Sequence, residues 1–225
     1  MNMDTDFLRK RIAQTKQDIF PLDRLLPLET VYAIFAEHYA KEPNKSIFFH
    51  DRKYQRLREG YIGLFVAASL WDISGKPHFI VFPEKPDNDL YFAYQLNETQ
   101  MGVYEFDVKE FTDHSPFFED FVAKSIAPKI GVYNIVITTY RNVGEREAKC
   151  LIDLLQKENT SRQIWLLGAP TENDESPDVS RVSVIGKDGL AYDRVINLSD
   201  WLNKTRPITV FHDVLRLKYP PSSGT

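Results

Sequence analysis

The chain has 225 residues, of which 43% are hydrophobic and 27% are charged, and its formal net charge is −4. This composition is typical of a globular protein and excludes both a largely disordered chain and a protein that is basic over its whole surface. The single cysteine, Cys150, excludes an intramolecular disulfide and a four-thiolate zinc site.

The order of charges at the N-terminus argues against secretion. Asp4 and Asp6 precede the basic run 9–11, and no apolar segment follows it, whereas a secretory signal begins with basic residues and continues into an apolar segment. The longest uncharged stretch, 60–71, is too short to cross a bilayer as a helix. We therefore expect a soluble, cytoplasmic protein that has no membrane partner.

The first third of the chain has the pattern of helices. Apolar residues recur at helical spacing over 7–20, 28–39 and 51–71, and Pro27 suits the start of the second segment. The third segment is highly charged in its first half and almost wholly apolar in its second half. We expect this helix to expose one end and to bury the other in the core, with residues 1–50 forming a helical N-terminal extension.

The middle third has the pattern of strands. Apolar or alternating runs cover 77–82, 89–96 and 101–111, and turn-forming residues separate them. The third run alternates strictly, which places apolar side chains on one face and Glu105, Asp107 and Lys109 on the other.

Strands and helices alternate in the remainder. The predicted elements are a helix over 116–129 with Ser115 as its N-cap, an apolar strand over 132–140, a helix over 144–158, a strand over 163–167, a hairpin of 182–185 and 191–196, and a short helix over 199–203. The strand–helix–strand unit predicts two parallel strands with a right-handed crossover. We expect an α/β protein in which helices flank a mixed sheet, built as a single domain over 1–225.

Several functional classes lack their motifs. No glycine-rich phosphate loop follows a strand, and no Gly-x-Ser-x-Gly turn is present. The five histidines are scattered without the spacing of metal ligands. Cys150 lies in a helical pattern beside apolar neighbours and is interpreted as part of the core.

The charged face of the third strand is the main indication of function. In an antiparallel hairpin the start of one strand lies beside the end of the next, so Asp89 is expected close to Asp107 and Lys109. Convergent carboxylates beside a lysine form an oxygen-ligand site for Mg²⁺ or Mn²⁺. The same alternation also suits an ordinary half-exposed strand that has one polar face.

The order of these residues resembles that of the PD-(D/E)XK, or restriction-endonuclease-like, nuclease superfamily. The resemblance is carried by Pro86-Asp87-Asn88-Asp89 before one strand and by Glu105-Phe106-Asp107-Val108-Lys109 on the next. Upstream, the segment 58–65 resembles the first helix of the family. The resemblance implies a restriction-endonuclease-like core over 51–168, with 169–225 adding C-terminal strands and a tail.

The resemblance also implies a role for each motif residue. Asp89 and Asp107 would hold Mg²⁺ or Mn²⁺, Glu59 would assist directly or through water, and Lys109 would act at the attacked phosphate. Asp87 follows the motif proline directly, whereas Asp89 immediately precedes the strand, and the choice between them stays open. The role of Glu105, as a helper or as a residue of the rim, also stays open.

The implied function is a metal-dependent nuclease, an endonuclease-like phosphodiesterase for which DNA is favoured over RNA as the substrate. The basic residues Arg52, Lys53, Arg56 and Arg58 would hold the phosphodiester backbone if they flank the acidic face; the alternative is a solvated helix surface. The rival function is a non-catalytic α/β interaction or structural protein. The sequence leaves open the oligomeric state, a homodimer included, and the role of residues 170–225.

Overall fold

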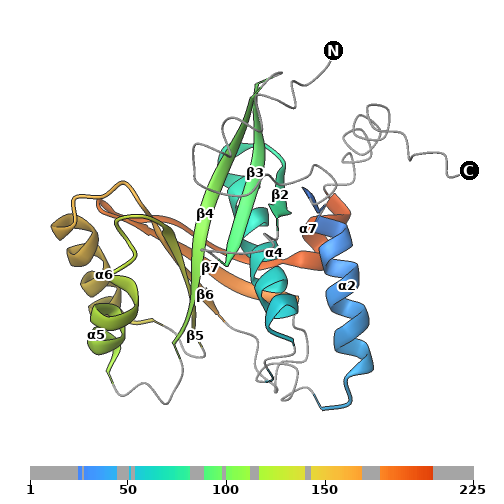
Figure 1. Ribbon diagram of the computed structural model, residues 1–225, viewed down its shortest axis with the longest axis horizontal. Helices are drawn as coiled ribbons and strands as arrows, with labels where there is room; N and C mark the ends of the chain where they lie inside the picture. The colour runs from blue at the N-terminus through green and yellow to red at the C-terminus, as the bar shows by residue number, and fades with distance from the viewer. Residues whose placement is uncertain are drawn as a thin grey trace, which may run out of the picture.

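The structure is a computed structural model that describes residues 25–26, 28–44, 51, 54–81, 89–97, 100–111, 117–139, 143–168 and 178–204. In these residues one twisted, mixed sheet carries helices on both faces, which confirms the predicted α/β class (Figure 1). Within the same residues, no helix combines the length and the apolar character that a membrane crossing requires.

The strands follow one another across the sheet in chain order. The described strands are β1 (Leu25–Leu26), β2 (His78–Val81), β3 (Leu90–Asn97), β4 (Gln100–Phe111), β5 (Asn134–Thr139), β6 (Ile164–Gly168), β7 (Val179–Gly186) and β8 (Gly189–Asn197). The β4–β5 and β5–β6 pairs are parallel and the other pairs are antiparallel. Each parallel pair is joined through helical segments, because parallel strands need a crossover.

One face of the sheet is covered by α2 (Leu28–Lys41), α4 (Gln55–Ser74) and α7 (Leu198–Lys204). Most of the apolar half of α4 is buried, against strand residues such as Ile80 and Phe92, as its composition predicts. Gly63 allows this close approach, because a Cβ atom at that position would lie 3.1 Å from Cδ1 of Ile80.

The other face is covered by α5 (Phe118–Phe121), the π-helical turn η3 (Val122–Ile126) and α6 (Glu145–Lys157). Leu151 and Leu155 of α6 pack there against alternate residues of β5 and β6. The two apolar layers therefore use opposite sides of the same strands, which explains why β5 is buried throughout.

The predicted helix over 116–129 is wrong in its details. The described helix begins at Phe118, becomes π-helical at Val122 and continues as turns after Ile126. Strand β5 begins at Asn134 rather than at Val132, which is 53% exposed. Ser115 and the predicted helix over 7–20 lie outside the described residues.

Three aromatic rings stack on the α4 side of β2, β3 and β4. The ring centroids of His78 and Tyr94 are 5.1 Å apart, and those of Tyr94 and Tyr104 are 4.8 Å apart. Gly102, opposite Tyr94 in the β3–β4 register, provides the space for the Tyr94 ring, because an added Cβ would lie 2.3 Å from its Cζ. The imidazole of His78 is buried, and this burial lowers the pKa of His78 to about 4.

Replacing Gly102 tests this packing. We expect Gly102→Ala to lower the free energy of unfolding by about 1–3 kcal/mol, since the added methyl group displaces the Tyr94 ring from its stack. Urea denaturation measures the loss. In the Tyr94→Leu background the same substitution should cost clearly less, and equal costs in the two backgrounds would contradict the assigned contact.

The buried imidazole of His78 predicts a pH dependence of stability. The unfolded chain binds a proton at His78 below pH about 6.5, whereas the folded protein does so only below about 4. His78 therefore lowers the free energy of unfolding as the pH falls from 6.5 toward 4, by about 3 kcal/mol in total. Denaturation curves of the wild type and His78→Phe at several pH values should diverge in this window; parallel curves would refute the assignment.

Candidate functional site

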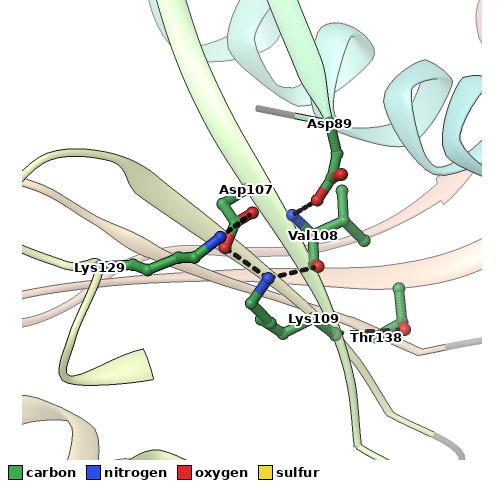
Figure 2. A network of polar contacts seen from close by, with 6 residues as sticks. All are labelled: Asp89, Asp107, Val108, Lys109, Lys129 and Thr138. Carbon is green, nitrogen blue, oxygen red and sulfur yellow. Dashed lines mark hydrogen bonds and ion pairs between the residues drawn. The ribbon is translucent and has the colours of Figure 1, made fainter. Parts of the chain in front are cut away.

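The register of the β3–β4 hairpin brings two aspartates together. Leu90 pairs with Phe106, so Asp89, one residue earlier, lies opposite Asp107. Because Leu90 and Phe106 face α4, both carboxylates project from the opposite face, and Lys109 follows Asp107 on that same face. The predicted proximity of Asp89, Asp107 and Lys109 is confirmed (Figure 2).

Asp107 is the centre of the cluster. Its side chain is only 3% exposed, and an ammonium group lies beside each of its carboxylate oxygens. Lys129 donates a hydrogen bond of 3.0 Å to Oδ1. The Nζ atom of Lys109 lies 2.6 Å from Oδ2 as an ion pair without hydrogen-bond alignment, and it donates to the Val108 carbonyl at 3.3 Å. Figure 2 shows the two lysines reaching the carboxylate from different sides.

Asp89 is held beside Asp107 at an electrostatic cost. Its Oδ2 accepts a hydrogen bond of 2.8 Å from the backbone N–H of Val108. Burial raises the pKa of Asp89, the Val108 hydrogen bond lowers it, and the charge and hydrogen bonding of Asp107 raise it, so that the net shift is upward. Like charges placed opposite one another in a sheet are destabilising.

Lys129 is the member of the cluster that sequence reasoning missed. It lies in the turn after η3, between the fully buried side chains of Ile126 and Ile130. Its backbone N–H donates to the Ile126 carbonyl, and its own carbonyl accepts from the N–H of Val132. Burial opposes the charged form, but the hydrogen bond and charge of Asp107 outweigh it, so the pKa of Lys129 is raised and the group stays cationic.

Glu59 and Glu105 do not complete a three-carboxylate group. Within the described residues, no set of three or more His, Cys, Asp or Glu side chains is placed to hold a metal ion. Glu59 is buried on α4, the helix of the other layer, and its Oε1 accepts a hydrogen bond of 2.9 Å from Gln55. Glu105 pairs with Tyr91 on the hairpin, and it lies two residues before Asp107 on the same face of β4.

Most of the expected basic surface lies outside the described residues. Arg58 donates a hydrogen bond of 2.7 Å to the backbone carbonyl of Asp51, so part of its guanidinium binds the backbone just before α4. Arg52, Lys53 and Asp87 lie outside the described residues, and so does the side chain of Arg56.

The cluster combines two carboxylates and two ammonium groups in a largely buried site. No protein-family model and no curated protein matches the chain. The chemistry available to the site therefore follows from the geometry of its own residues, which provides oxygen donors for a cation and ammonium donors for an anion.

Removing the charge of Asp89 should stabilise the protein. The folded state raises the pKa of this carboxyl, so its contribution to stability is complete below pH about 3.9 and is lost as the pH rises through the folded value. Asp89→Asn keeps an acceptor for the Val108 N–H and should increase the free energy of unfolding at pH 7.5.

Urea denaturation at pH 7.5 and at pH 3 measures this effect, and the gain should vanish at the lower pH. Glu110→Gln, which alters an exposed carboxylate on the same β4 strand, serves as a control expected to stay within about 0.5 kcal/mol of the wild type. A destabilised Asp89→Asn variant at pH 7.5 would contradict the electrostatic reading.

Proposed function

We propose that the chain is a metal-dependent nuclease that hydrolyses phosphodiester bonds at Asp89, Asp107 and Lys109. One observation carries this proposal: the carboxylate of Asp89, just before β3, and the ammonium groups of two lysines lie beside the buried carboxylate of Asp107 on β4. A site that must bind a cation and a phosphate together needs both kinds of group. The preference for DNA over RNA rests on the sequence resemblance.

The order of elements around the cluster supports the resemblance to the restriction-endonuclease-like core. Helix α4 is followed by the antiparallel strands β2, β3 and β4, then by a helical segment and the parallel strand β5. Asp89 precedes β3 directly, and Asp107 and Lys109 lie on β4. This placement supports Asp89 as the motif acid.

The two aspartates fit a hard divalent cation. They offer only oxygen donors, and the side chain of Asp107 is only 3% exposed. Mg²⁺ is commonly held by one or two carboxylates, with water and substrate phosphates as the other ligands, so two protein ligands suffice. Bound by Asp89 and Asp107, Mg²⁺ or Mn²⁺ would lower the pKa of a coordinated water and stabilise charge on the phosphate.

Lys109 suits the role of a phosphate-binding cation. Its side chain is 22% exposed, so the ammonium group can meet a substrate while it remains beside Asp107. The hydrogen bond to the Val108 carbonyl holds it at the end of the carboxylate pair. A compact ammonium there would neutralise part of the charge that develops on the attacked phosphate.

A non-catalytic interaction or structural protein is the second candidate, and the charge balance of the cluster favours it. Two carboxylates and two ammonium groups neutralise one another, so the cluster would also serve as a polar link between β4 and the turn after η3. Calorimetric titration with Mn²⁺ separates the two candidates, since a metal site binds the ion and a purely structural link does not.

Cleavage assays test the nuclease directly. We expect the wild type to cleave DNA with Mg²⁺ or Mn²⁺ and to lose this activity in EDTA. Asp107→Asn and Lys109→Met should each reduce cleavage by at least about 100-fold, because they remove a metal ligand and a phosphate contact. Labelled double-stranded DNA, single-stranded DNA and RNA identify the substrate.

Matched controls come from the adjacent helical layer. Asp120→Asn and Lys124→Met alter exposed groups of the same types and should retain full activity, and circular dichroism should show that all four variants fold. Undiminished cleavage in both site variants would refute the assignment, and so would the absence of metal-dependent cleavage of every substrate by the wild type.

A further inference from the structure

Lys129 belongs to a different structural element from the rest of the cluster. Asp89, Asp107 and Lys109 belong to the β3–β4 hairpin, whereas Lys129 lies in the turn that leads from η3 to β5. Its side chain is 38% exposed, while that of its partner Asp107 is 3% exposed. The side chain of Lys129 is therefore partly in contact with solvent, whereas that of Asp107 is enclosed.

The position of Lys129 conflicts with metal binding. A Mg²⁺ ion must approach a carboxylate oxygen to about 2.0–2.1 Å, yet Oδ1 of Asp107 accepts a hydrogen bond from Lys129 and Oδ2 lies beside Lys109. An ammonium group at 3.0 Å from the same carboxylate repels a divalent ion. A cation at Oδ1 would therefore have to displace Lys129, and a cation at Oδ2 would have to displace Lys109.

The geometry distinguishes the two lysines. Lys109 lies on the same strand as Asp107, is less exposed and is tied to the Val108 carbonyl. Lys129 reaches the carboxylate from another element, and its larger exposed fraction allows the ammonium to swing into water while the backbone of the turn stays in place. Lys129 is the group that can leave at the smaller cost.

We propose that Lys129 is a built-in counter-ion that occupies the place of the divalent cation in the metal-free protein and leaves when the cation binds. This inference rests on the proposed function, because it takes the Asp89–Asp107 pair as the metal site. Lys129 is then a positioning residue that keeps the two carboxylates together without metal. It also sets the metal affinity, since every cation that binds must break its contact with Asp107.

Calorimetric titration of MnCl₂ into the metal-stripped full chain tests the inference. Lys129→Met keeps the length of the side chain and removes its charge, so we expect Mn²⁺ to bind at least about tenfold more tightly than to the wild type. Lys129→Arg keeps the charge and should leave the affinity near that of the wild type. Lys124→Met, a matched loss of an exposed lysine nearby, should leave it unchanged.

Two further variants make the result decisive. Lys129→Gln is a second neutral replacement in case the methionine variant does not fold, which circular dichroism reports. Asp107→Asn combined with Lys129→Met should lose the tight binding, which places the bound Mn²⁺ at Asp107.

The outcomes separate this inference from the proposed function. Suppose that Asp107→Asn abolishes Mn²⁺ binding in an otherwise wild-type chain. Equal or weaker binding by the neutral Lys129 variants then overturns the role of Lys129 and leaves the metal site standing. Tightening in Lys129→Arg as well would also overturn it, because charge would not then be the competing feature. Absence of Mn²⁺ binding by the wild type and by both neutral variants overturns both proposals.

Discussion

The pairing of Leu90 with Phe106 is the constraint on which the candidate site depends. It fixes Asp89 opposite Asp107 and sends both carboxylates to the face that α4 does not cover. A shift of one residue in this register would turn the charged residues of β4 into the α4 core and its apolar residues outward. The burial of Leu90 and Phe106 under α4 therefore also holds two mutually repelling acids in contact.

The two helical layers make different contributions to the cluster. The α4 layer supplies the apolar burial that fixes the register, and its own acid, Glu59, stays on that side of the sheet. The layer of α5, η3 and α6 supplies Lys129, whose ammonium neutralises Asp107. The carboxylates are thus placed by one layer and neutralised by the other, so that neither layer alone accounts for the arrangement.

The sequence predicts what depends on local pattern. Strand alternation and hairpin geometry suffice to place Asp107 and Lys109 on one face and Asp89 beside them. Lys129 escapes such reasoning because its contact with Asp107 depends on where the helix after β4 ends, and a π-helical turn followed by further turns does not follow from apolar spacing. The expected role of Glu59 depends on how α4 lies across the sheet, which periodicity along one helix does not determine.

The strands lie across the sheet in the order in which they occur in the chain, and this order has a consequence for folding. Each strand pairs with the strand next to it in the chain, so no earlier pair has to open to admit a later strand. The β3–β4 and β7–β8 hairpins each have only two residues between their strands, so closing them costs little chain entropy. The aspartate pair can consequently assemble before β5 docks, and its neutralising lysine arrives only with the slower crossover.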